Sequence, residues 1–172
     1  DGYGLAETIK QQRPEIKTVF GGVHVSAIGT PLLKAFPAID FLCMGEGEAT
    51  LAELADGAPP ADITGLIWRD DGRIVTNPRR PLLPDLDQMP FPAYDRSAFT
   101  FIESNRLRRE DVELADPTLA VMPARGCPFR CSFCVNSLLH PMFKGLGPFT
   151  RRRSVDNILE EIQSVLRLPG NR

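Results

Sequence analysis

The chain of 172 residues lacks the features that mark several large protein classes. Basic residues are not in excess, because 20 Lys and Arg face 22 Asp and Glu, so we expect no non-specific binding to nucleic acid. Long apolar runs are missing, and a stretch such as Leu119–Met122 is far shorter than the roughly 20 residues of a membrane-spanning helix. No charged-then-apolar leader opens the sequence. With 42% hydrophobic and 24% charged residues, the composition predicts a globular, cytoplasmic protein without a membrane span.

Cysteine is scarce, and its distribution argues against a disulfide framework. Three of the four cysteines, Cys127, Cys131 and Cys134, are crowded together, whereas Cys43 stands alone in an apolar stretch. In a small, secreted, disulfide-stabilised domain, the cysteines would be spread along the chain to link distant loops. A chain of this length can bury a sufficient core without such links. The crowding favours a metal centre, and Cys43 is expected to be a core residue.

The first part of the chain alternates helix and strand patterns. Two β-branched, apolar runs each end in a glycine-rich loop, which is typical of buried parallel strands. Asp71-Gly72 between two apolar runs predicts a β-hairpin after them. The expected elements are helices over 5–12 and 31–36, strands over 16–20 and 39–44, a helix capped by Thr50, and a hairpin over 65–76. This order predicts half of a parallel α/β domain.

The second part begins with a proline-rich segment. Five prolines between Pro78 and Pro92 exclude a helix or a central strand there, so we expect a connector. For the polar stretch 103–116, a loop and a short exposed helix are both open. A strand is expected over 118–122, and a helix from Ser154 with one apolar face, made of Val155, Ile158, Leu159, Ile162, Val165 and Leu166. The cysteine loop would then join a strand to a helix.

Charge is unevenly distributed along the chain. Between Phe36 and Asp71 there are eight acidic residues and one basic residue, and between Pro117 and Val155 there are six basic residues and no acidic one. For the acidic stretch between Phe36 and Asp71, an ordinary solvated surface explains the charge at least as well as a functional electrostatic field does. The cationic surroundings of the cysteines favour thiolate ligands and anionic substrates.

The spacing of the cysteines indicates a specific kind of metal centre. Three and then two residues separate Cys127, Cys131 and Cys134, so one loop can wrap three sulfurs around a compact inorganic cluster and leave one position open. A structural zinc would need a fourth ligand, for which His140 and the distant Cys43 are the candidates. The spacing favours iron and sulfur, and a zinc-stabilised binding module remains the alternative.

The run Gly126-Cys-Pro-Phe-Arg-Cys-Ser-Phe-Cys134 resembles the C-x3-C-x-aromatic-C loop of radical S-adenosylmethionine (SAM) enzymes. The resemblance implies that the three cysteines hold a 4Fe-4S cluster and that Phe133 packs beside the adenine of SAM. It further implies that the amino and carboxylate groups of SAM chelate the fourth iron, and that an electron from the reduced cluster cleaves SAM to a 5′-deoxyadenosyl radical. The loop would follow the first strand of a partial TIM barrel.

The first half resembles the cobalamin-binding domain that precedes some of these barrels. The similar runs are Phe20-Gly-Gly-Val-His-Val-Ser26, Asp40 to Glu48, Ile63 to Ile67 and Gln88 to Tyr94. The resemblance implies that Gly21 and Gly22 line the nucleotide tail of cobalamin, with Gly45, Glu46 and Gly47 in the neighbouring loop. His24 is not the cobalt-ligating histidine of other cobalamin domains and is expected to be a polar loop residue.

Together, these resemblances imply an α/β protein with a Rossmann-like cobalamin-binding part over 1–77, a connector over 78–117 and the start of a radical SAM barrel over 118–172. Because the chain begins at Asp1 and ends soon after a helical pattern, we expect a piece of a longer protein. The implied reaction is methylation of an unactivated carbon of a small molecule, with oxidative cyclisation of a porphyrin-type substrate as the alternative. The implied partner is an electron donor such as flavodoxin or ferredoxin, and no catalytic side chain is assigned.

Overall fold

The computed structural model describes residues 2–93, 100–109 and 118–168. The chain divides into two compact units. The first comprises Asp1–Leu82 and Phe129–Phe149, and the second comprises Leu83–Pro128 and Thr150–Arg172. Parts of the predicted connector, residues 94–99 and 110–117, lie outside the described residues. Among the residues described, no helix is both long and apolar enough to cross a membrane.

The first unit is built on a four-stranded sheet in the order β1-β2-β3-β4. Strands β1 (Val19–Phe20) and β2 (Phe41–Cys43) are parallel, whereas β3 (Leu66–Asp70) and β4 (Arg73–Thr76) continue the sheet in antiparallel fashion. The predicted parallel pair and hairpin are both confirmed, although the parallel strands are shorter than expected. Asp71 and Gly72 form the hairpin turn with φ of 44° and 82°, in the left-handed region that this tight turn requires.

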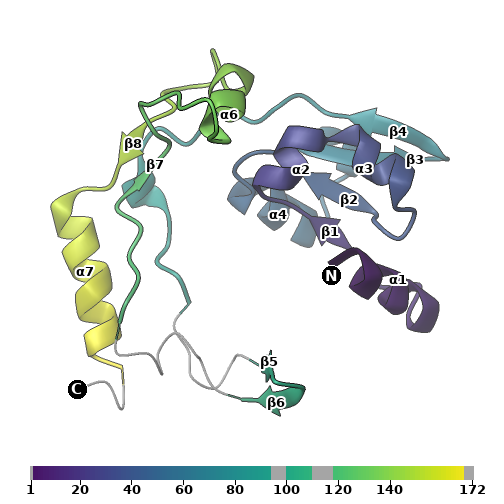
Figure 1. Ribbon diagram of the computed structural model, residues 1–172, viewed down its shortest axis with the longest axis horizontal. Helices are drawn as coiled ribbons and strands as arrows, with labels where there is room; N and C mark the ends of the chain where they lie inside the picture. The colour runs from purple at the N-terminus through teal and green to yellow at the C-terminus, as the bar shows by residue number, and fades with distance from the viewer. Residues whose placement is uncertain (1, 94–99, 110–117, 169–172) are drawn as a thin grey trace. The chain divides into compact units, whose positions relative to one another are not determined.

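The helices of the first unit are α1 (Gly2–Gln12), α2 (Val23–Ile28), α3 (Thr30–Ala35), α4 (Glu48–Ala55) and α6 (Asn136–Met142), with a 3₁₀ turn over Pro60–Asp62. Helices α2 and α3 lie side by side against strands β2 and β4 (Figure 1). The buried core consists of Val25, Leu32, Leu33, Ile39, Leu42, Met44 and Ile67.

One predicted helix cap is wrong. Helix α4 begins at Glu48, two residues before Thr50, so Thr50 lies inside the helix and is fully buried. Its hydroxyl donates to the Thr64 carbonyl at 2.9 Å and accepts from Arg80 Nε at 3.1 Å. The threonine therefore ties α4 to the segments on either side of the hairpin.

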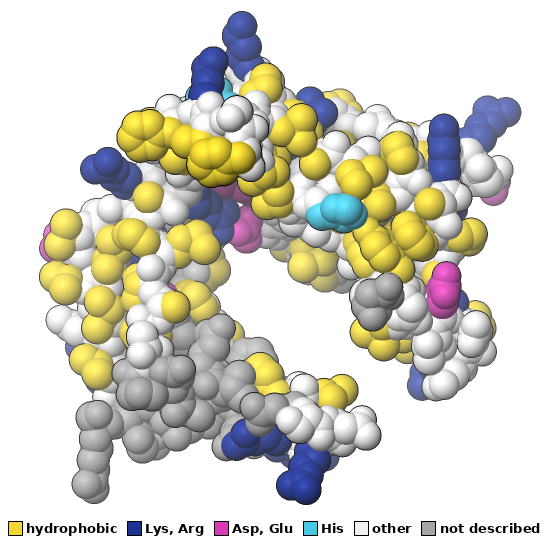
Figure 2. Space-filling model, viewed as in Figure 1, with side chains coloured by type: hydrophobic (Ala, Val, Ile, Leu, Met, Phe, Trp, Pro, Cys, Tyr) yellow, Lys and Arg dark blue, Asp and Glu magenta, His cyan; other side chains and the backbone are white. Residues whose placement is uncertain are grey.

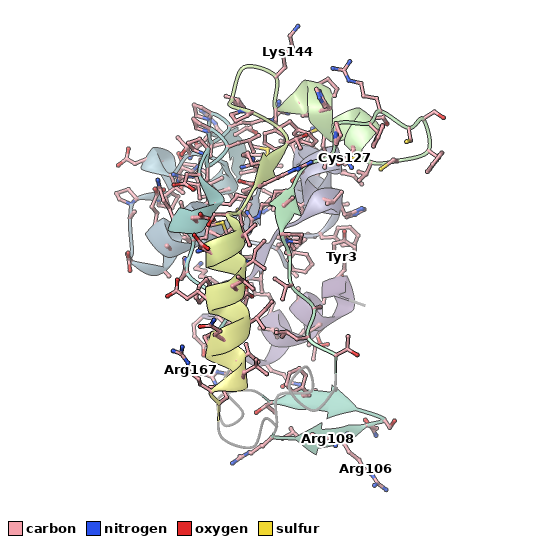
Figure 3. All side chains as sticks on the ribbon, turned by 90° about the vertical axis from the view of Figure 1, so that its left-hand side faces the viewer. Tyr3, Arg106, Arg108, Cys127, Lys144 and Arg167 are labelled. Atoms are coloured by element: carbon pink, nitrogen blue, oxygen red, sulfur yellow. The ribbon has the colours of Figure 1, made fainter. Side chains whose placement is uncertain are left out.

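The second unit contains two small antiparallel sheets and one long helix. Strands β5 (Phe101–Glu103) and β6 (Arg106–Arg108) form a hairpin, on which Figure 3 labels Arg106 and Arg108. The described part of the polar stretch is thus paired in a sheet and does not form the exposed helix that was one of its two expected states. Helix α7 (Val155–Leu166) starts at the predicted Ser154 cap, whose hydroxyl accepts from the Asn157 amide at 3.1 Å. A 3₁₀ turn over Leu86–Gln88 is the one helical turn described within the proline-rich segment.

The strand predicted over 118–122 is not observed. The strand that precedes the cysteine loop is β7 (Ala124–Arg125), and it pairs in antiparallel fashion with β8 (Arg151–Arg152). An apolar, extended segment becomes a strand only when a neighbour pairs with its backbone groups. No described segment pairs with residues 118–122, and the ladder forms where β8 returns beside the chain.

Candidate functional site

Two glycine loops lie at one edge of the first unit's sheet. Gly21 and Gly22 follow β1 directly, and Gly45 to Gly47 follow β2. Because β1 and β2 are parallel, both loops leave the carboxyl edge of the sheet, where ligands bind in open α/β folds. The structure therefore places the five predicted residues of this region on one edge.

The backbone at this edge can be approached closely. A Cβ at Gly22 would meet nothing within 4 Å, and φ of this residue is +90°, a conformation that glycine adopts readily. A Cβ at Gly21 would lie 3.7 Å from the Cβ and carbonyl oxygen of Cys43. Because glycine has no side chain, the space beside Gly22 is open, and a bulky ligand could approach the main chain there.

Ser26 ties the two glycine loops together, a role that the sequence analysis missed. This buried hydroxyl donates to the Gly22 carbonyl at 2.9 Å and accepts from the Gly45 amide at 2.8 Å. Helix α2 places Ser26 four residues after Gly22, at the spacing where a serine hydroxyl reaches back along the helix. A serine four residues after a glycine that starts a helix is the only signal that the sequence offered.

His24 lies on helix α2 and not in a loop, so that part of the prediction is wrong. The six-residue helix starts immediately after Gly22, and short helices without a distinct apolar period are difficult to recognise from sequence. The exposed His24 ring lies 6.4 Å from the ring of Tyr3, which is stacked between Phe20 and Phe36 at centroid distances of 5.5 and 4.0 Å.

Cys43 is a core residue, as predicted. It lies at the end of β2 and is buried, and this burial raises the pKa of its thiol. A protonated, buried thiol is a poor metal ligand and a poor nucleophile. Cys43 thus differs from the three cysteines of the later loop.

The cysteine loop starts beyond strand β7, and Figure 3 shows Cys127 just past the end of that strand. Cys127 belongs to the second unit, and Cys131 and Cys134 belong to the first. The Cys134 amide donates to the Cys131 carbonyl at 3.0 Å and closes a turn. The Ser137 amide and hydroxyl then donate to the Cys134 carbonyl at 3.0 and 2.7 Å, which joins this turn to helix α6.

The three thiols are free and within reach of solvent. Cys131 is exposed, and Cys127 and Cys134 are half-buried. No preformed group of three or more potential metal ligands occurs in the described ranges 2–93, 100–109 and 118–168. Three reduced, accessible sulfurs on one loop are nevertheless the donor set that an iron–sulfur cluster requires.

Exposed apolar side chains lie within and on either side of the turn between Cys131 and Cys134 along the chain. Phe133 is 92% exposed, and Phe129, Val135 and Leu138 are exposed as well. Figure 2 shows hydrophobic side chains at the surface over α6. His140, the fourth ligand of the zinc alternative, has its Nδ1 3.3 Å from Arg130 Nη2, and its ring contacts Phe149 at 5.0 Å. A neighbouring guanidinium disfavours a second cation at this nitrogen.

Comparison with known proteins identifies relatives of both parts of the chain. The B12 binding domain family matches residues 3–55. The chain is 32% identical over 166 residues to an uncharacterized methyltransferase of Pyrococcus horikoshii, a match that covers 94% of this chain and 33% of that protein. It is 33% identical to the anaerobic magnesium-protoporphyrin IX monomethyl ester cyclase of Rubrivivax gelatinosus, with 73% of this chain and 22% of the cyclase covered.

A third relative is the cobalamin-dependent radical SAM methyltransferase TokK of Streptomyces tokunonensis, which is 29% identical over 76% of this chain and 19% of its own length. Among solved structures, the radical SAM methyltransferase TsrM of Kitasatospora setae, with tryptophan and a SAM analogue bound, matches with a TM-score of 0.61 at 24% identity. That match covers 95% of this chain and 30% of TsrM. A second TsrM structure, at 19% identity over 95% of this chain and 31% of TsrM, holds cobalamin and a 4Fe-4S cluster and gives a TM-score of 0.54.

The chain spans a third or less of the length of these curated relatives. The structural match, which covers nearly all of this chain and 30% of TsrM, confirms the predicted architecture, in which a Rossmann-like cobalamin-binding part precedes the start of a radical SAM barrel. Residues 3–55 therefore match the B12 binding domain family, and the chain as a whole is similar to cobalamin-dependent radical SAM proteins.

Proposed function

We propose that this chain is part of a cobalamin-dependent radical SAM enzyme that methylates an unactivated carbon of a small molecule. The observation on which the proposal rests is that one chain combines a glycine-lined sheet edge, inside the matched B12 domain, with a C-x3-C-x2-C loop of free thiols. Relatives named as methyltransferases support this reaction.

Cys127, Cys131 and Cys134 are the proposed ligands of three irons of a 4Fe-4S cluster. Their thiols are unpaired with one another and accessible, and the turn Cys131–Cys134 is fixed to α6 by hydrogen bonds. Phe133, with 92% of its surface exposed, is the proposed packing surface for the adenine of SAM. When bound, the cluster and cobalamin would supply the electron that cleaves SAM and the methyl group that is transferred.

Gly21, Gly22, Gly45, Glu46 and Gly47 form the proposed tail-binding edge for cobalamin. Glycines at the first two positions let a ligand reach the backbone, and the Ser26 hydrogen bonds hold the two loops at a fixed separation. The proposed division of the chain is a cobalamin-binding part over 1–77, a connector over 78–117 and the start of the barrel over 118–172.

A second candidate function is oxidative cyclisation of a porphyrin-type substrate. It is favoured by the 33% identity to the cyclase of Rubrivivax gelatinosus. In both functions the substrate is a small molecule, and an electron donor such as flavodoxin or ferredoxin must reduce the cluster. The cytoplasm is the proposed location, because closely spaced thiols stay reduced there. Product analysis distinguishes the candidates, since only methyl transfer adds a carbon to the substrate.

Anaerobic reconstitution with iron and sulfide tests the cluster. The wild-type chain is expected to become brown, with absorption at about 400 nm. Cys131→Ala should lose the stable 4Fe-4S signal, because two thiols on one loop cannot replace three. Cys43→Ala is the matched control and should retain the full cluster, since this buried thiol lies on β2. A colourless wild-type protein that binds one zinc would instead support the binding-module alternative.

A further inference from the structure

The aromatic side chain that ends helix α6 packs against the glycine edge of the sheet. Phe143 is 6% exposed and lies beside Gly45, so that a Cβ placed on Gly45 would come within 2.8 Å of the Phe143 ring. Helices α2 and α6 also contact one another within the first unit. The ring therefore fills the space that a side chain at position 45 would occupy.

Gly45 is held from two directions. Its amide donates to Ser26 Oγ at 2.8 Å, and the Phe143 ring occupies the space where a Cβ would lie. The φ of Gly45 is +80°, so the position suits glycine, the residue with the greatest freedom to leave a given conformation. A ring packed on such a residue restricts the loop that continues through Glu46 and Gly47.

The same helix is joined to the cysteine loop through backbone hydrogen bonds. The Cys134 amide donates a hydrogen bond to the Cys131 carbonyl, and the Ser137 amide and hydroxyl donate to the Cys134 carbonyl. At the other end of the helix, the Phe143 amide donates to the Leu139 carbonyl at 3.1 Å. Phe149 supports the Phe143 ring with a centroid distance of 6.4 Å. One hydrogen-bonded segment thus joins a proposed cluster-binding turn at its start and packs on a proposed cobalamin-binding loop at its end.

We propose that Phe143 is a positioning residue that couples the two cofactor sites. The inference rests on the proposed function. The ring holds the Gly45–Gly47 loop in the conformation that binds cobalamin, and binding of the cluster at Cys131 and Cys134 further restrains the hydrogen-bonded turn from which α6 starts. Because coupling between two binding sites is reciprocal, each cofactor then raises the affinity of the chain for the other.

Cobalamin titration of the full chain, with and without the reconstituted cluster, tests this coupling. For the wild type we expect the cluster to tighten cobalamin binding by about fivefold or more, the lower end of typical allosteric coupling. Phe143→Ala should weaken cobalamin binding and bring the ratio of the two affinities close to one. Phe36→Ala is the matched control, since Phe36 stacks on Tyr3 in the same unit and should leave the ratio unchanged.

A second pair of variants covers the case in which Phe143→Ala does not fold. Phe143→Leu keeps an apolar side chain but removes the flat ring, so the ratio should fall while the fold is retained. Gly45→Ala forces a Cβ into the ring and should also reduce the ratio. A wild-type ratio of one, or an unchanged ratio in a folded Phe143 variant, would overturn the coupling while leaving the proposed function in place. No cobalamin binding by the wild type would reject both.

Discussion

The two units of the chain are stabilised by different kinds of contact. In the first unit, seven buried apolar residues pack between the sheet and helices α2 and α3. In the second unit, Glu161 is only 1% exposed and forms an ion pair with Arg153. Arg153 also donates to the Asn157 side chain at 2.6 Å and to the Met122 carbonyl at 3.3 Å. An apolar core lies under the proposed cobalamin edge, whereas a polar network links helix α7 to the segment that precedes strand β7 and Cys127.

Removal of the buried charge in the second unit is expected to have the largest effect. Glu161→Gln leaves the Arg153 guanidinium, whose side chain is only 12% exposed, without its anionic partner. Breaking one side of a buried ion pair costs about 3–5 kcal/mol, because the remaining charge stays desolvated. Hydrogen exchange followed by mass spectrometry should show lost protection in α7 and β7. Unchanged protection there would mean that apolar contacts, and not this pair, stabilise the second unit.

A cavity in the core of the first unit is expected to cost nearly as much. Leu42 on β2 is fully buried, and Leu42→Ala removes three carbon atoms from the centre of the cluster. Such substitutions lower the free energy of unfolding by about 2–5 kcal/mol. Urea unfolding checks the magnitude, and hydrogen exchange should place the loss in strands β1 to β3. Exposed Leu51 on α4 provides the control, because Leu51→Ala leaves no cavity.

Local sequence patterns predicted most of the helices and strands of the first unit, because the residues that determine each of them lie close together in the sequence. The Asp71-Gly72 turn, the proline at the start of α3 and the apolar strands that end in glycine all have direct structural causes. The second unit was predicted less well. Strand β7 forms where β8 can pair with it, and the apolar run before it has no such neighbour among the described segments. Pairing between distant segments leaves no local signal.

The candidate site shows the same limit. The glycines and cysteines were identifiable because they follow strands or repeat at short intervals. Ser26 and Phe143 were missed, since their roles depend on contacts with Gly45 that are made across the fold. Glu161 had a usable signal: it lies three residues after Ile158 and four before Val165, inside the apolar stripe of α7. A charged residue at such a position is a candidate for a buried pair.

The first unit also contains a carboxylate whose effect depends on pH. Partial burial raises the pKa of Asp40, but hydrogen bonds from Lys10 and from the amide and hydroxyl of Thr18 outweigh it, so that the pKa is lowered overall. The stabilisation is present above the unfolded-state pKa of about 4 and is lost as the pH falls through the lower, folded-state value. Asp40→Asn should lower the unfolding free energy by about 1–2 kcal/mol at pH 7. The difference should shrink as the pH falls below the unfolded-state pKa and through the lower, folded-state pKa of Asp40, and a difference that does not change with pH would contradict the assignment.

The smallest effect is expected for a second arginine–glutamate ion pair, which is more exposed than the Arg153–Glu161 pair. Arg80 pairs with Glu53 in the first unit, where the Glu53 side chain is 41% exposed. After Glu53 is replaced, the Arg80 guanidinium keeps its hydrogen bond to Thr50 and, with its side chain 21% exposed, part of its contact with water, so we expect this pair to contribute at most about 1 kcal/mol. Glu53→Gln should therefore shift the urea midpoint only slightly, although it makes the same chemical change as Glu161→Gln. A loss as large as that of Glu161→Gln would show that burial does not explain the difference between the two units.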